Sequence, residues 1–95
     1  MILSNEPGYY LPGSYGMRIE NLLLTQSADL VSEKPFLCFE TLTLAPIDRN
    51  LIDPGLLRED ERAWLNGYHA RVLREVGPHI PPDTRTWLAQ ACAPV

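Results

Sequence analysis

Pro46 divides the sequence into two halves with different hydrophobic patterns, and this division limits the fold more than any other feature. Before Pro46, apolar residues form three runs, at 2–4, 17–25 and 36–45, which contain the β-branched and aromatic residues typical of strands. After it, apolar residues recur every three or four positions, as on one face of a helix. We therefore predict an α+β fold in which three β-strands are followed by two or three α-helices.

The three predicted strands differ in their surroundings. A polar segment at 26–35 is expected to be a surface loop before the third strand. The third run has apolar side chains on both alternating faces, which predicts a strand inside a sheet that is covered on both sides. Turn-forming residues separate the first two runs: Pro7-Gly8, Pro12-Gly13 and Gly16. Strands without covering helices expose edges and an apolar face, so we expect this half to pair with another chain.

Helix-start and helix-stop signals organise the second half. Asp53 before Pro54 is typical of a helix N-terminus, with Asp53 as N-cap. A longer helix is predicted over 59–76, because its first turn is acidic and because Gly77, as the C′ residue before a proline, would stop it. Its apolar face consists of four residues at helical spacing, with Trp64 beside them: Leu65, Tyr68, Val72 and Val76. Asp83 is predicted to cap a last short helix that continues through Trp87, Leu88, Ala91 and Cys92.

The composition argues against several classes of partner. The net charge is −4, the pI is near 5.0, and the eight Lys and Arg residues form no basic run, so we expect no nucleic-acid partner. No apolar stretch approaches the roughly 20 residues of a membrane span, and the first residues lack the pattern of a secretory signal. Cys38 and Cys92 are too few and too far apart for a disulfide framework or a zinc finger. We therefore expect two reduced thiols in a cytoplasmic protein with no membrane contact.

Two glutamates, Glu6 and Glu20, lie on either side of the turn-rich segment. A hairpin there would bring both carboxylates to one place; two buried carboxylates that face each other would repel, and one would take up a proton. Divalent cations relieve this repulsion, and oxygen ligands suit hard or borderline ions, manganese among them. Strand alternation puts Arg18 on the same face as Glu20, about 6.6 Å away, as a fixed positive charge. From spacing alone, an ordinary turn glutamate and an exposed Arg-x-Glu ion pair remain alternatives.

The sequence blocks around these glutamates resemble a known family. They are Ser4-Asn5-Glu6-Pro7-Gly8-Tyr9-Tyr10 and Gly16-Met17-Arg18-Ile19-Glu20-Asn21, followed by Phe39-Glu40, Leu42-Thr43-Leu44, Pro46-Ile47-Asp48, Leu51-Ile52-Asp53, Trp64-Leu65-Asn66, Tyr68-His69, Trp87-Leu88 and Pro94-Val95. In order and spacing they resemble the C-terminal part of the Xaa-Pro aminopeptidases (aminopeptidase P), which belong to the pita-bread metallopeptidases of family M24. The later blocks resemble the extra C-terminal region of the long, cytosolic type. The resemblance covers nearly the whole chain.

This resemblance implies a C-terminal fragment of a pita-bread fold. Residues 1–46 would be the last strands of the catalytic domain, and residues 47–95 the helical C-terminal extension. It also implies an activity, because these dinuclear metallo-aminopeptidases remove the N-terminal residue from peptides with proline at position two.

The resemblance also assigns roles to four residues. The family's dinuclear site uses two aspartates, one histidine and two glutamates, and Glu6 and Glu20 match the glutamates. Glu20 would bridge two divalent metal ions, expected to be manganese, and Glu6 would bind one of them. Arg18 and Tyr10 match an arginine and a tyrosine that support the catalytic site through hydrogen bonds.

The remaining ligands of the family site lie upstream of the Glu6 segment and are missing here. His69 is predicted to lie mid-helix as a partly exposed or hydrogen-bonded structural residue, and His79 to lie solvated in a loop. We therefore expect the chain to begin inside a catalytic domain, as an engineered piece, a proteolytic piece or the product of a split gene. By itself it is expected to bind no metal tightly and to be inactive.

Two other functions stay open. The C-terminal extension resembles a region that packs subunits into dimers, so the chain could be an interaction module that forms a homodimer. The candidate contact residues, for which packing in the chain's own core is the alternative role, are Trp64, Tyr68, Trp87 and Leu88. The other alternative is a pita-bread relative that has lost catalysis and only binds.

Overall fold

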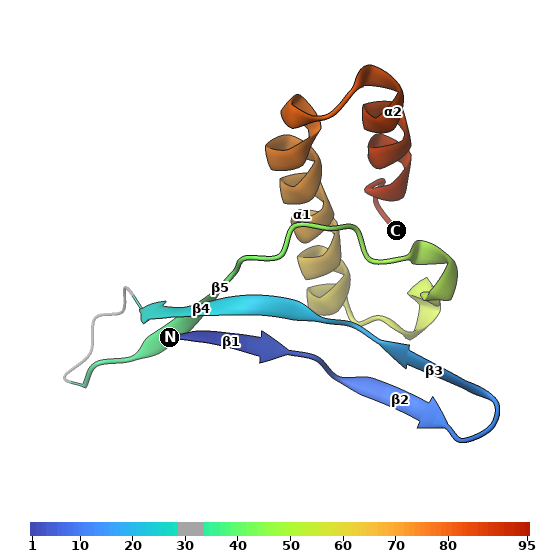
Figure 1. Cartoon of the computed structure of the whole chain (residues 1–95). Helices are drawn as coiled ribbons and strands as arrows, with labels where there is room; N and C mark the ends of the chain where they lie inside the picture. The colour runs from blue at the N-terminus through green and yellow to red at the C-terminus, as the bar shows by residue number, and fades with distance from the viewer. Residues whose placement is uncertain (29–33) are drawn as a thin grey trace. The chain divides into compact units, whose positions relative to one another are not determined.

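The computed structural model describes residues 1–28 and 34–95, which form two compact units, 1–43 and 44–95 (Figure 1). The first unit contains strands and the second contains helices. The α+β class predicted from the sequence is therefore confirmed. The predicted surface loop at 26–35 includes five residues, 29–33, that lie outside the described part of the chain.

The described part of the first unit has five antiparallel strands. They are β1 (Ile2–Asn5), β2 (Gly8–Leu11), β3 (Tyr15–Arg18), β4 (Asn21–Ser27) and β5 (Leu37–Thr41). One sheet has the order β1-β4-β5, and β2 pairs with β3 in a second, two-stranded sheet. Figure 1 shows β1 and β2 in succession along one side, with β4 and β3 beside them, so that the two pairings follow one another along a single ribbon.

The number of strands differs from the three expected, because Pro7 interrupts the pairing. A proline has no backbone N–H to donate to a strand ladder. Ile19 N–H still donates to Pro7 O at 3.1 Å, but the reciprocal bond of that pair cannot form. The run predicted as one strand over 17–25 is thus divided into the end of β3 and most of β4.

The expectation that the third predicted strand lies inside a covered sheet was wrong for the described residues. β5 is an edge strand of its sheet, and the central strand is β4. Leu37 and Phe39 of β5 are more than half exposed. Apolar residues on both faces of a run indicate what the faces contact, but they do not say whether the strand lies at the centre or at the edge of its sheet.

The second unit is built around two α-helices and three short 3₁₀ turns. The α-helices are α1 (Glu59–Val76) and α2 (Pro82–Ala91), and the turns are η1 (Arg49–Leu51), η2 (Pro54–Leu56) and η3 (Gly77–His79). Tyr68 and Val72 of α1 pack with Leu88 of α2 and with Cys92 in a small core. The predicted helix over 59–76 and its apolar face are confirmed, since Leu65, Tyr68 and Val72 are buried.

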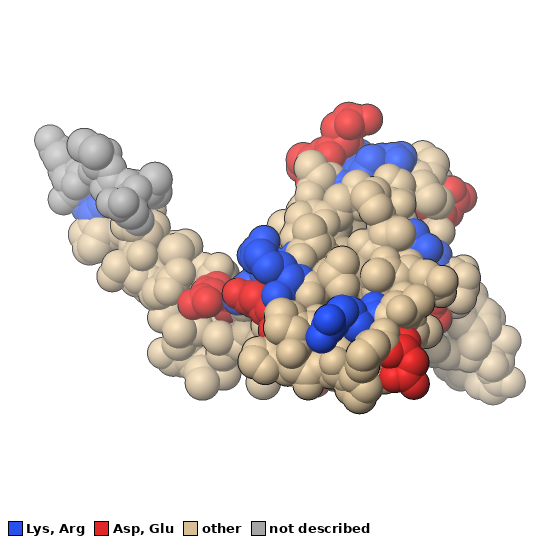
Figure 2. Space-filling model, turned by 90° about the horizontal axis from the view of Figure 1, so that it is seen from above, with Lys and Arg blue, Asp and Glu red and all other residues tan. Residues whose placement is uncertain are grey.

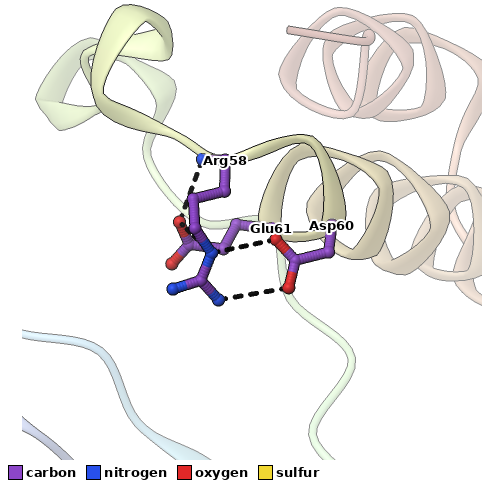
Figure 3. A network of polar contacts seen from close by, with 3 residues as sticks. All are labelled: Arg58, Asp60 and Glu61. Atoms are coloured by element: carbon purple, nitrogen blue, oxygen red, sulfur yellow. Dashed lines mark hydrogen bonds and ion pairs between the residues drawn. The ribbon is translucent and has the colours of Figure 1, made fainter.

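Carboxylates at the N-terminus of α1 satisfy its first turn (Figure 3). The Arg58 backbone N–H donates to the Glu61 carboxylate at 3.0 Å, and the Arg58 guanidinium donates to both oxygens of Asp60 at 3.0 and 3.1 Å. The hydrogen bond from Arg58 lowers the pKa of Asp60; a smaller desolvation effect opposes it, and backbone hydrogen bonds lower the pKa slightly further. Acidic residues at this end also interact favourably with the helix dipole.

Three predicted helix termini need correction. Asp53 caps only the 3₁₀ turn η2, where it accepts from Gly55 N–H at 2.9 Å. Gly77 is not a left-handed C′ residue, because its φ of −50° continues the helical conformation into η3. Asp83 lies in the first turn of α2 and not at the cap, which is Pro81.

The charges of the described residues are mixed in sign. On the face shown in Figure 2, Lys and Arg side chains lie in small groups near Asp and Glu side chains, and most of the surface is uncharged. Among residues 1–28 and 34–95, no helix combines the length and the apolar character needed to cross a membrane.

Candidate functional site

Glu6 and Glu20 lie at the same interruption of the β1–β2 and β3–β4 ribbon. The pair Asn5 and Asn21 precedes the interruption, and the pair Gly8 and Arg18 follows it. Both pairs share one register, and this register sets Glu6 opposite Glu20. The hydrogen bond from Ile19 to Pro7 follows the same register through the gap.

This register also brings the two glutamate side chains close together. Because Ile19 donates to Pro7, the neighbouring pair of Glu6 and Glu20 belongs to the non-hydrogen-bonded type, in which Cα atoms lie about 4.5 Å apart and side chains approach most closely. Like charges directly opposite each other destabilise a ribbon. A nearby positive charge relieves this repulsion, and Arg18 of β3 supplies one through its ion pair with Glu6.

Both oxygens of Glu6 have partners. Arg18 Nη1 donates to Glu6 Oε1 at 3.0 Å, and Ser4 Oγ donates to Glu6 Oε2 at 2.5 Å. Ser4 comes two residues before Glu6, so strand alternation puts both side chains on one face. Sequence reasoning missed Ser4, although this spacing was available as a signal.

Tyr10 of β2 holds the other side of Arg18. Arg18 Nε donates to the Tyr10 hydroxyl at 2.7 Å, and the guanidinium carbon lies 5.6 Å from the centroid of the Tyr10 ring. This hydrogen bond and the electrostatic attraction to Tyr10 raise the pKa of Arg18; desolvation lowers it by less, and Glu6 and Glu20 add the smallest increases. The arginine therefore stays charged, and its direction is set by Tyr10 on one side and by Glu6 on the other.

The predicted site residues thus come together within one ribbon. Glu6, Tyr10 and Arg18 are joined by direct contacts, and Glu20 is linked to Arg18 by charge and to Glu6 by register. The site is exposed in this chain, since every residue of β1, β2 and β3 is exposed.

The site fits part of a metal centre. Two carboxylates on one face provide the oxygen ligands that divalent cations such as manganese accept. The described residues contain no group of three or more His, Cys, Asp and Glu side chains that could hold a metal ion. A metal centre at this place would therefore need further ligands from outside the described residues, beside these two carboxylates.

Neither histidine contributes to this ribbon, because both belong to the second unit. His69 of α1 is fully buried and its Nε2 accepts from Ile47 N–H at 3.0 Å, so of the two expected roles the hydrogen-bonded structural one is confirmed. Burial, and to a lesser extent the charge of Arg49, lowers the pKa of His69, so it is a neutral structural residue at neutral pH. His79 lies exposed in η3.

The second unit has a hollow of its own of about 490 Å³. Its lining residues come from the segment before α1 and from α2: Pro46, Ile47, Asp48, Arg49, Asn50, Trp87, Gln90 and Ala91. The lining has one carboxylate, from Asp48, and no facing pair. It therefore lacks the acidic ligand pair found in the ribbon.

The four residues considered for dimer contacts divide into two groups. Tyr68 and Leu88 are buried in the core of the second unit, so they are unavailable to a partner. Trp64 and Trp87 are more than half exposed, and the Trp64 ring stacks on Tyr68 at 5.2 Å between centroids. Only these two tryptophans keep the character of contact residues.

Comparison with known proteins gives consistent matches along the whole chain. A family model for the C-terminal region of peptidase M24 matches residues 35–95. The Xaa-Pro aminopeptidase app-1 of Caenorhabditis elegans is 48% identical over 99% of this chain and 16% of its own length. A probable Xaa-Pro aminopeptidase P of Arthroderma benhamiae is 46% identical over 99% of this chain and 14% of its own length.

A solved structure matches equally well. The crystal structure of X-prolyl aminopeptidase from Caenorhabditis elegans, described as a cytosolic enzyme with a di-nuclear active site, superposes with a TM-score of 0.90 at 47% identity. The match covers 99% of this chain and 16% of that one. The chain therefore spans about one sixth of the length of the relatives it matches.

Proposed function

Because this chain belongs to the Xaa-Pro aminopeptidases of the M24 peptidase family, we propose that it forms the C-terminal part of a dinuclear metallo-aminopeptidase. The complete enzyme removes the N-terminal residue from peptides with proline at position two. Residues 1–46 are the last strands of its catalytic domain, and residues 47–95 are its helical C-terminal extension. The observation that carries this proposal is the register that sets Glu6 opposite Glu20, with Arg18 bonded to Glu6.

In the proposed site, Glu20 would be a ligand shared by two metal ions, and Glu6 would be a ligand of one of them. Bound metal ions, which we propose to be manganese, would supply the chemistry of a water molecule of lowered pKa and of a polarised peptide carbonyl. This chain's own contribution is to hold two carboxylates opposite each other and to keep a charged arginine beside them. Tyr10 and Ser4 fix the orientation of that arginine and of Glu6 through hydrogen bonds.

The 95-residue chain alone is proposed to be inactive, because its described residues supply only two acidic ligands. Incubation of the purified chain with manganese and the peptide Arg-Pro-Pro should release no arginine. Release of arginine above the rate of a Glu20→Gln control would overturn this part of the proposal.

In the full-length polypeptide, Glu20→Gln should abolish cleavage of Arg-Pro-Pro and weaken manganese binding without unfolding the protein. The amide keeps the shape of the side chain and removes the charge that a bridging ligand needs. Glu40→Gln in β5 is a matched control, since Glu40 belongs to the same unit but not to the ribbon, and it should keep both properties. Full activity of Glu20→Gln would remove Glu20 from the site.

A second proposal concerns assembly. The long type of enzyme is proposed to be a cytoplasmic homodimer with Trp64 and Trp87 among its contacts, because both large aromatic side chains are more than half exposed. Sedimentation of the full-length polypeptide should give a dimer that Trp87→Ala weakens. A monomer in the unmodified protein would contradict it. A dimer without peptidase activity would instead favour a pita-bread relative that only binds.

A further inference from the structure

The Tyr10 ring lies directly against the backbone of two glycines in the ribbon. Tyr10 and Gly16 are cross-strand partners, and a Cβ placed on Gly16 would lie 2.6 Å from Tyr10 Cδ1 and 3.1 Å from Cε1. A Cβ on Gly8 would lie 2.8 Å from the Tyr10 hydroxyl oxygen and 3.1 Å from the backbone oxygen of Met17. The ring therefore occupies the space that side chains at 8 and 16 would need.

Backbone conformation does not explain these glycines. Among the described residues, the one glycine with a positive φ is Gly13, at 76° in the turn between β2 and β3. Gly8 and Gly16 have ordinary strand conformations, where a glycine weakens a strand and any other residue would be allowed. What they provide is a close approach for the aromatic ring.

This close approach determines where the Tyr10 hydroxyl lies. Gly8 is the cross-strand partner of Arg18, so a ring that extends from Gly16 towards Gly8 ends beside the arginine. The hydroxyl then accepts from Arg18 Nε at 2.7 Å, while Arg18 Nη1 donates to Glu6 Oε1 at 3.0 Å. The chain of contacts thus leads from Gly16 through Tyr10 and Arg18 to Glu6.

We propose that Gly16, assisted by Gly8, is a positioning residue: it forms a flat seat for the Tyr10 ring and so holds Arg18 against Glu6. The packing of Tyr10 on Gly16 is independent of the proposed function, but the expected effect on metal binding rests on the proposed function. Outer partners of metal ligands change metal affinity by about 10- to 100-fold when they are removed. We therefore expect Gly16→Ala to weaken manganese binding by about tenfold, because its new methyl group displaces the ring.

The first part of the test uses four variants of the full-length polypeptide: Gly16→Ala, Tyr10→Ala, their combination, and Gly13→Ala as control. Gly13 belongs to the same hairpin, its Cβ would meet nothing within 4 Å, and its positive φ makes alanine unfavourable. Gly13→Ala should thus lower the unfolding midpoint without changing manganese affinity. Affinity is measured by calorimetric titration of the metal-free protein, and unfolding is measured on the same metal-free samples.

The expected result is strong coupling between positions 10 and 16. In the Tyr10→Ala background no ring remains to be displaced, so adding Gly16→Ala should change neither the affinity nor the unfolding midpoint by more than the error. If Gly16→Ala alone does not fold, restored folding of the combined variant gives the same support. If Gly16→Ala lowers the affinity and the unfolding midpoint equally with and without the Tyr10 ring, the proposed packing of the ring on Gly16 is wrong. Unchanged affinity of Gly16→Ala would overturn its role in positioning.

The two proposals fail in different ways. If the unmodified protein binds no manganese, the proposed metal function fails. The role of Gly16 is then tested by unfolding midpoints alone. If the contacts extend from Gly16 to Glu6, the effects of Gly16→Ala and Glu6→Gln on the midpoint should not be additive in the combined variant. Additive effects in that combination would overturn the proposal.

Discussion

The two units of this chain are stabilised in different ways. Every residue from 1 to 20 in the first unit is exposed, and its site is ordered by backbone pairing and by hydrogen bonds among polar side chains. The second unit has a small core of its own, in which Val72 and His69 are fully buried. Among the described residues, the unit that contains the candidate site is thus the one without buried core residues.

The largest expected effect comes from the core of the second unit. Leu88→Ala should lower the free energy of unfolding of that unit by about 2–5 kcal/mol, the usual cost of truncating a buried leucine. Leu88 is 3% exposed, whereas Leu56 is 82% exposed, so Leu56→Ala should change the free energy little. Urea titration of the helical circular dichroism measures both. Equal losses of unfolding free energy in Leu88→Ala and Leu56→Ala would contradict the assignment of Leu88 to the core and of Leu56 to the surface.

The next effect is the pH dependence of the second unit. The pKa of His69 is lowered in the folded state, so the unfolded state binds more protons. Stability is complete above the ordinary histidine pKa of about 6.5 and falls as the pH drops below it, by at most about 1.4 kcal/mol per pH unit. His69→Gln should flatten this slope between pH 7 and pH 5, while His79→Gln should not. If the pH dependence of stability persists in His69→Gln, another titrating group is its cause.

A third prediction compares the effect of a glycine-to-alanine substitution on the stability of each unit. Gly67 lies in α1 with nothing within 4 Å of its missing Cβ, so Gly67→Ala should stabilise the second unit by about 1 kcal/mol. Gly16→Ala should destabilise the ribbon instead, because the Tyr10 ring fills the space. Thermal unfolding of each variant measures the sign. The same sign in both would mean that glycine acts through the unfolded chain alone.

The smallest effect is expected at the N-terminus of α1. The pKa of Asp60 is lowered, so its contribution is present above the ordinary aspartate pKa of about 4 and is lost as the pH falls through the lower folded value. Asp60→Asn should remove this loss and leave the neutral-pH stability almost unchanged, since both partners are exposed. A substantial change at pH 7 in urea titration would show that this pair stabilises the helix more than exposed pairs do.

Sequence reasoning was most successful where local signals agree. The bounds of α1 followed from its acidic first turn and its glycine-proline stop, and they are confirmed. The resemblance to the Xaa-Pro aminopeptidases is confirmed by the comparisons. The metal roles of Glu6 and Glu20 and the supporting roles of Arg18 and Tyr10 stay predictions, now with a register and contacts that support them.

The sequence was less informative where tertiary contacts decide. The division of the ribbon at Pro7 depends on which strand faces the proline, and no local pattern states this. The conformation of Gly77 and the burial of His69 depend on how the second unit packs: Arg85 donates to Gly77 O at 2.7 Å, and Ile47 donates to His69. The missed residues Ser4 and Gly16 matter through partners across or along the ribbon, and only the alternation of Ser4 with Glu6 was visible beforehand.

The interruption at Pro7 has a consequence for errors of folding. A two-stranded ribbon can slip by one residue, and such a slip turns each side chain towards the wrong neighbour. Here a slip would place Tyr10 opposite Tyr15 or Met17, where no glycine leaves room for its ring. It would also separate Glu6 from Glu20. The close fit of Tyr10 on Gly16 therefore disfavours misaligned ribbons through packing alone, independently of any ligand.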